Sequence, residues 1–312
     1  MGDSVIEVEG IRYSYGRTLA VDGISFSVAA GEVVGFLGPN GAGKSTTVKI
    51  LTGMLAPDEG SVRMLGYRGG SNRLEIHARI GVCFEEKNLY LEMTGRENLL
   101  FFARLFGIRA YDSTAALRRV GLSERGDDRV KRYSKGMRQR LMIARALVNT
   151  PDIIFLDEPT DGLDPVSART IRGIITEEAG RGAAVFLTTH DMMEADHLSD
   201  RVAFINQGRI VAMDTPEDLK LEHGKRSVRV RVRTNGNVDE HVVDLGNAQA
   251  GELLRRVADD PGLMTIHTEE ASLEDIFVKL TGRGLVWDAV RRFWRYSART
   301  CCSTPAITCF LR

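Results

Sequence analysis

A glycine-rich loop between a predicted strand and a predicted helix restricts the possible folds of this chain more than any other feature. The apolar run EVVGFL precedes the loop and is typical of a strand, whereas TTVKILTGML follows it with the spacing of a helix. The loop has the pattern G-x-x-x-x-G-K-[ST] and consists of Gly38, Pro39, Asn40, Gly41, Ala42, Gly43, Lys44 and Ser45. This order of strand, loop and helix predicts a site for the phosphates of a nucleotide.

Each residue type in the loop has a chemical use. Glycines allow successive backbone N–H groups to point inward at phosphate oxygens, and the following helix adds the positive end of its dipole. Lys44 supplies a positive charge to the outer phosphates, Ser45 can bind Mg²⁺, and the adjacent Thr46 is a further nucleotide-binding candidate. An ordinary glycine-rich turn is the alternative, but the flanking strand and helix favour the phosphate loop.

A second apolar strand ends in two carboxylates. The run Ile153–Leu156 leads directly into Asp157 and Glu158. On an extended backbone neighbouring side chains point apart, so Asp157 can reach Mg²⁺ while Glu158 orients and deprotonates an attacking water. A solvated acidic pair at a strand end is the alternative, and the phosphate loop disfavours it.

The remaining pattern of residues 1–220 predicts an α/β fold. Apolar runs alternate with turns over residues 5–35, which predicts a small antiparallel layer. Strand-like and helix-like segments then alternate, which predicts a mainly parallel sheet flanked by helices. The runs Ile153–Leu156 and Ala184–Leu187 are too continuously apolar to face water, so we expect them in the middle of that sheet.

A domain boundary is predicted near residues 215–225, because TPEDLKLEHGK has a proline, a glycine and many charges. Residues 225–282 then predict a small α+β accessory domain. In SVRVRVR valine and arginine alternate, which predicts a half-buried edge or surface strand. The further expected elements are the strand HVVDL, a helix around Ala250–Ala258, a strand around Leu263–His267, and a helix that begins after Ser272 and ends near Gly282.

Charge and hydropathy limit the partners and the location of the chain. Lys and Arg number 42, as do Asp and Glu, so no bulk charge favours nucleic acid, and we expect no nucleic-acid partner. The first residues lack a secretion signal, and no run of about 18 apolar residues occurs. We therefore expect a cytoplasmic protein.

With these motifs the chain resembles the ATP-binding subunits of ABC transporters, from residue 5 to about residue 220. The segment YSKGM, residues 133–137, resembles the family signature, which commonly reads LSGGQ, and departs from it at three of five positions. The resemblance implies a P-loop ATPase with an antiparallel β subdomain and a helical subdomain that carries the signature. It also implies that Ser134 and Gly136 contact the γ-phosphate of a nucleotide held by a second copy. A plain N-cap role for Ser134 remains the alternative.

Three further positions match motifs of the same family. Asp164, within DGLDP, resembles the key acid of the loop through which two subunits sense each other. His190 follows a predicted strand, where the family places a histidine that holds the γ-phosphate and the water. Tyr15 resembles the aromatic residue that stacks on adenine, although Tyr13 also suits that role. After IGVCF, where the family usually has glutamine, this chain has Glu85, which the resemblance implies as a Mg²⁺ ligand with altered coupling.

The resemblance also implies how the chain works. ATP and Mg²⁺ would be its cofactors, and it would hydrolyse ATP between two copies in a head-to-tail dimer. The segment Asn88–Leu99 would receive a helix of an integral membrane permease, so the chain would be peripheral on the inner face of the cell membrane. Residues 225–282 resemble a domain of the drug and antibiotic exporter branch, which implies export and antibiotic resistance.

Several alternatives remain open. A soluble ATPase of the wider family, not coupled to a membrane, usually has tandem copies or a long coiled coil, and this sequence shows neither. Glu85 and the altered signature favour a regulatory subunit with little turnover, whereas the signature and the paired acids argue against a small-molecule kinase. Residues 285–312 are a basic amphipathic tail that can lie on a membrane, begin a fused permease, or dock on its own domain.

Overall fold

A computed structural model describes residues 4–68, 72–84, 88–224, 227–234, 237–245, 250–258, 260–269 and 271–282. Two predictions fall outside these residues, namely the Mg²⁺-binding role of Glu85 and the amphipathic tail 285–312. Among the described residues, no helix has both the length and the apolar character that a bilayer crossing requires.

The centre of the first domain is a six-stranded sheet in which the strand order is β10-β9-β3-β8-β7-β6. Neighbouring strands are parallel except for β10, which pairs antiparallel with β9. Every residue of β3, β7 and β8 is buried, and the predicted central position of the last two is confirmed. The strand bounds are β3 Val33–Leu37, β6 Ile80–Cys83, β7 Ile153–Asp157, β8 Ala184–Thr189, β9 Arg201–Asn206 and β10 Arg209–Asp214.

A four-stranded antiparallel sheet of order β2-β1-β4-β5 forms a second layer, as the opening of the chain predicts. Only two of the three opening runs belong to it, because the third run is β3 of the parallel sheet. β3 is apolar on both faces, and only a position between covering layers buries both. The strand bounds are β1 Ser4–Tyr15, β2 Thr18–Ala29, β4 Glu59–Met64 and β5 Tyr67–Arg68.

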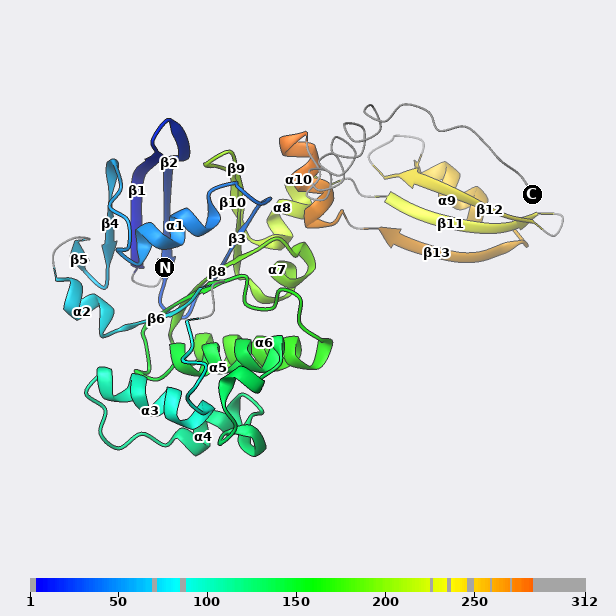
Figure 1. The fold of residues 1–312 in the computed structure, drawn as a ribbon. Coiled ribbons are helices and arrows are strands. Elements are labelled where there is room, and N and C mark those ends of the chain that lie inside the picture. Colours follow the sequence, from blue (N-terminus) through cyan, green and yellow to red (C-terminus); the bar gives the residue numbers. More distant parts are fainter. Residues whose placement is uncertain are drawn as a thin grey trace, which may run out of the picture.

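Helices cover both faces of the parallel sheet (Figure 1). Helix α1 packs between the two sheets through Val48, Ile50 and Leu51. Helices α3 to α6 bury a separate core against the other face, which receives Val185 and Leu187 of β8. The bounds are α1 Lys44–Leu51, α2 Arg73–His77, α3 Gly95–Leu105, α4 Ser113–Arg119, α5 Lys135–Ala146, α6 Pro165–Gly180, α7 Met192–Leu198 and α8 Pro216–His223, with 3₁₀ turns Ser123–Arg125 and Val130–Arg132.

The accessory segment is a three-stranded antiparallel sheet of order β12-β11-β13 with one helix. Its alternating strand β11 is the central strand, so of the two predicted alternatives the edge strand is wrong and the half-buried surface strand is confirmed. Alternation reports which face is covered and says nothing about how many edges are paired. The bounds are β11 Ser227–Thr234, β12 Asn237–Asp244, α9 Ala250–Ala258 and β13 Leu263–Glu269.

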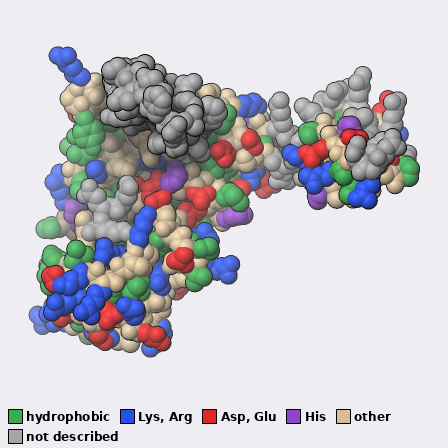
Figure 2. Space-filling view, turned by 45° about the vertical axis from the view of Figure 1, so that its right-hand side comes forward, with side chains coloured by type: hydrophobic (Ala, Val, Ile, Leu, Met, Phe, Trp, Pro, Cys, Tyr) green, Lys and Arg blue, Asp and Glu red, His purple; other side chains and the backbone are tan. Residues whose placement is uncertain are grey.

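The last described helix, α10 (Leu273–Thr281), packs on the first domain. Ser272 caps its start and Gly282 its end, as the sequence predicts. Its buried residues Ile276 and Phe277 join a core with Phe204 of β9. The accessory sheet lies to one side of the first domain, on the side where α8 and α10 are found (Figure 1). Acidic and basic side chains are interspersed over the face seen in Figure 2.

Candidate active site

The phosphate loop and the acidic strand end meet in one cleft. Leu37 pairs with Thr189, and Asp157 pairs with Thr188, so the carboxyl ends of β3, β7 and β8 lie at one edge of the sheet. A cleft of about 490 Å³ opens there. It is lined by Tyr15, Ala20, Pro39, Asn40, Gly41, Gly43, Lys44, Ser45, Thr46, Glu158, Asp161 and His190.

Steric limits explain two glycines of the loop. Gly43 has φ +110°, and a Cβ atom there would lie 2.5 Å from the backbone oxygen of Ala20. At Gly38 an added Cβ would lie 2.3 Å from the backbone oxygen of Ile205. Only glycine therefore allows the loop to pass this close to the neighbouring backbone. Gly38 and the buried Ala42 support the loop without lining the cleft.

The ammonium group of Lys44 is held at the inner end of the cleft. The side chain is buried, and its Nζ donates a hydrogen bond to the backbone oxygen of Gly38 at 2.7 Å. The same Nζ lies 3.2 Å from Oε1 of Glu158. Lys44 thus presents a desolvated positive charge at the start of α1, where backbone N–H groups also favour an anion.

Asp157 and Ser45 form an oxygen-only donor pair. The Ser45 hydroxyl donates to Oδ1 of Asp157 at 3.3 Å, and the hydroxyl of Thr188 donates to the same oxygen. Hydroxyl and carboxylate oxygens are the donors that Mg²⁺ prefers, and Mg²⁺ usually takes few protein ligands beside substrate phosphates. The described residues contain no cluster of three metal-binding acids, histidines or cysteines, so this pair with a nucleotide's phosphates is the donor set that fits.

Glu158 and His190 form a second, separate pair. Oε2 of Glu158 lies 2.8 Å from Nδ1 of His190 and also accepts the backbone N–H of His190 at 3.3 Å. Glu158 has φ +49°, a conformation that costs free energy in residues other than glycine and concentrates at functional sites. The side chains of Asp157 and Glu158 therefore point apart because the backbone of Glu158 is in the left-handed conformation, and not because the backbone is extended as the sequence suggested.

A buried carboxylate that sequence reasoning missed ties these segments together. Glu194 is 3% exposed, and its Oε2 accepts hydrogen bonds from the hydroxyls of Thr160 and Thr189. Burial raises the pKa of Glu194. Thr160 lies two residues after Glu158 and Thr189 directly precedes His190, so Glu194 ties together the segments that carry both catalytic candidates.

The signature residues lie outside the lining of the cleft. Ser134 is the N-cap of α5 and accepts the backbone N–H of Met137 at 3.2 Å. Asp164 is the N-cap of α6, and hydrogen bonds from Ser167 lower the pKa of its carboxyl. Gly136 faces Ser167 across a gap that an added Cβ would reduce to 3.2 Å. Capping is therefore established for Ser134 and Asp164, whereas their contacts with a nucleotide stay predictions.

Tyr15, rather than Tyr13, is the aromatic residue in the cleft lining. Its side chain is exposed, and the two rings meet edge to face with centroids 4.9 Å apart. Tyr13 packs against the core of the first domain. Asp161 is a lining acid that the sequence did not single out, although it belongs to the same DGLDP segment as Asp164.

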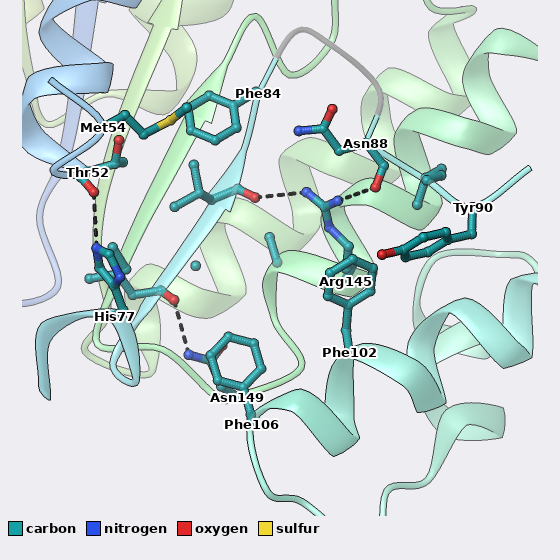
Figure 3. Close-up of a pocket in the computed structure, with 15 residues that line it drawn as sticks. Thr52, Met54, His77, Phe84, Asn88, Tyr90, Phe102, Phe106, Arg145 and Asn149 are labelled. Atoms are coloured by element: carbon teal, nitrogen blue, oxygen red, sulfur yellow. Dashed lines mark hydrogen bonds between the residues drawn. The ribbon is translucent and has the colours of Figure 1, made fainter. Parts of the chain in front are cut away.

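A second cleft, of about 610 Å³, lies beside the segment Asn88–Leu99 (Figure 3). The Arg145 guanidinium lies 4.9 Å from the Phe102 ring and donates to the backbone oxygens of Asn88 at 2.6 Å and Val82 at 3.4 Å. Burial lowers the pKa of Arg145. The aromatic residues that line this cleft are Phe84, Tyr90, Phe102 and Phe106.

Comparisons with known proteins identify the family of the chain. Residues 21–161 match the ABC transporter family. The fluoroquinolones export ATP-binding protein of Mycobacterium tuberculosis is 45% identical over 296 residues, which cover 91% of this chain and 96% of that protein. The Nod factor export ATP-binding protein I of Paraburkholderia xenovorans is 38% identical, over 91% of this chain and 99% of that protein.

Solved structures show the same fold. A structure described as the ATP binding subunit of an ABC transporter has a TM-score of 0.66 and 30% identity, and the match covers 70% of this chain and 92% of that one. An ATP-binding cassette described as dimeric, post-hydrolysis and bound to ADP and Pi has a TM-score of 0.62 and 25% identity, over 67% of this chain and 98% of that one. The chain belongs to the family of ABC transporter ATP-binding subunits, which are ATPases. This conclusion follows from these relatives together with the chain's own phosphate loop and acidic strand end.

Proposed function

We propose that this ATPase energises export of a substrate through a separate membrane permease, from a peripheral position on the inner face of the cell membrane. The names of the relatives support export, since one is an exporter subunit for fluoroquinolones and the other for Nod factor. The cleft supports Mg²⁺ as the metal, because Ser45 and Asp157 supply only oxygen donors.

The incomplete cleft is the observation that carries the dimer proposal. Lys44, Glu158 and His190 line it, whereas Ser134 lies outside its lining at the start of α5. The backbone N–H groups and the capping hydroxyl at a helix N-terminus can bind a γ-phosphate. We therefore assign Ser134 to the cleft of a second copy, arranged head to tail. The description of a similar cassette as dimeric supports the presence of a second copy.

Four lining residues and the neighbouring Asp157 have proposed parts in hydrolysis. The Lys44 ammonium neutralises charge on the outer phosphates, and Glu158 takes the proton of the attacking water. His190, 2.8 Å from Glu158, keeps that carboxylate oriented. Mg²⁺, held by Ser45 and Asp157, would neutralise further charge on the phosphates. Loss of the bridging γ-phosphate then weakens the dimer, and its opening is the stroke that drives the permease.

The second cleft is the proposed contact with the permease. Its lining is mostly apolar and includes four aromatic residues, it adjoins the predicted segment Asn88–Leu99, and it has room for one face of a helix. Arg145 links this cleft to the backbone on both sides of residues 85–87 through its bonds to Val82 and Asn88. A helix seated there can therefore act on the backbone at Val82 and Asn88.

Two variants test the catalytic assignment. We expect Glu158→Gln to bind ATP, to lower phosphate release by about 10²- to 10⁴-fold, and to accumulate as a dimer with Mg·ATP in size-exclusion chromatography. Lys44→Ala should abolish nucleotide binding, because it removes the buried charge that meets the phosphates. Glu177→Gln, an exposed glutamate of α6, is the control and should behave as the parent. An unchanged rate in Glu158→Gln would contradict the assignment of the base.

A further inference from the structure

We propose that Lys135 couples the two nucleotide sites of the dimer, by holding the signature helix of each chain against the acidic loop of that chain's own cleft. The inference rests on the proposed head-to-tail dimer. Lys135 occupies the third signature position, where the sequence LSGGQ has glycine. A glycine has no side chain with which to make the contacts described below, so this coupling is a property of the present sequence.

A series of neighbouring polar groups runs from the signature to the phosphate loop. Nζ of Lys135 lies 3.0 Å from Oδ2 of Asp161, a residue that lines the cleft. The other carboxylate oxygen of Asp161 lies 4.0 Å from Nε2 of His190. His190 contacts Glu158, and Glu158 contacts Lys44. Polar and charged groups thus follow one another from the start of α5 to the phosphate loop.

The backbone around Lys135 is shaped to accept its side chain. Gly162, next to Asp161, has φ +61°, and a Cβ atom there would lie 2.3 Å from Nζ of Lys135. Gly136 allows the start of α5 to pack closely on Ser167 of α6. The start of α5 therefore meets the loop after Glu158 through the Lys135 side chain, and it meets α6 through Gly136.

This contact connects different clefts of the proposed dimer. Ser134, next to Lys135, serves the cleft of the partner, whereas Asp161 lines the cleft of its own chain. Rearrangement of Glu158 and His190 during hydrolysis in one cleft thus reaches the signature that completes the other. The side chains of Lys135 and Asp161 are 54% and 44% exposed, so their ion pair is weak enough to break and reform in each cycle. Its loss should change the coupling between sites by a factor of about 1.5 to 5.

The test is the dependence of the ATPase rate on ATP concentration in the full chain. We expect a Hill coefficient between 1 and 2 in the parent and a value closer to 1 in Lys135→Met, which keeps the stem of the side chain but removes its charge. Lys135→Arg should restore the parental value. In the parent, added salt should lower the coefficient toward that of Lys135→Met, with little effect on the variant itself.

Lys131→Met is the matched control, because Lys131 is also a half-exposed lysine, paired at 2.8 Å with Glu92 away from the cleft. Equal Hill coefficients in the parent and Lys135→Met, or an equal loss in Lys131→Met, would overturn the inference. A double variant of Lys135→Met and Asp161→Asn should be no less cooperative than either single variant, and additive losses would count against the pair. Failure of the proposed function itself would appear separately, as absence of the ATP-trapped Glu158→Gln dimer.

Discussion

Replacing Phe277 with alanine tests whether α10 belongs to the core of the ATPase domain. Phe277 is 1% exposed, and its ring meets that of Phe204 edge to face with centroids 5.5 Å apart. The same core contains Leu37, the last residue of β3 before the phosphate loop. The Phe277 side chain of α10 thus belongs to the same core as the end of β3, the strand that leads to the catalytic site.

The expected loss of stability is large for a single substitution. Removal of a fully buried phenylalanine leaves a cavity and typically costs about 3–5 kcal/mol. For a domain of this size, each kcal/mol lowers the melting temperature by about 2–4 °C. We therefore expect Phe277→Ala to melt about 6–20 °C below the parent.

Thermal unfolding of the full chain, followed by circular dichroism, measures this shift. Val278→Ala is the control, because Val278 is the next residue on the same helix and is 39% exposed. It should melt within about 2 °C of the parent, as surface substitutions usually do. If Phe277→Ala melted as close to the parent as Val278→Ala does, α10 would not be part of this core.

Two further substitutions test other contacts. Burial raises the pKa of Glu194 above its ordinary value of 4.5, so the folded chain binds this proton more tightly than the unfolded chain, and stability is lost as pH rises from about 4.5 through the raised value. Glu194→Gln keeps an oxygen for Thr160 but does not titrate, so its melting temperature should rise relative to that of the parent as the pH increases through this range. Parallel melting-temperature profiles of the two proteins would contradict this. Phe106→Asp should prevent co-purification of an integral membrane protein with the tagged chain, because it charges the second cleft. Leu105→Asp, at the neighbouring exposed position, should not, and equal losses would remove the proposed permease contact.

Local sequence patterns were sufficient for the phosphate loop, the paired acids and the position of β7 and β8. Glycine spacing around Lys44 dictates a backbone that only glycine adopts, and continuous apolar runs require burial on both faces. These features depend on neighbours within about ten residues, so the sequence alone determined them. The caps Ser272 and Gly282 of α10 were predictable for the same reason.

Contacts between distant segments were decided only by the tertiary structure. Alternation in β11 did not reveal its two neighbours, and the caps of α10 did not reveal that Phe277 packs against Phe204. Likewise, no local pattern brings Lys135 within 3.0 Å of Asp161, or Glu194 onto Thr160. Periodicity and spacing specify local conformation and which face is buried, whereas the partner on that face depends on the packing of the whole chain.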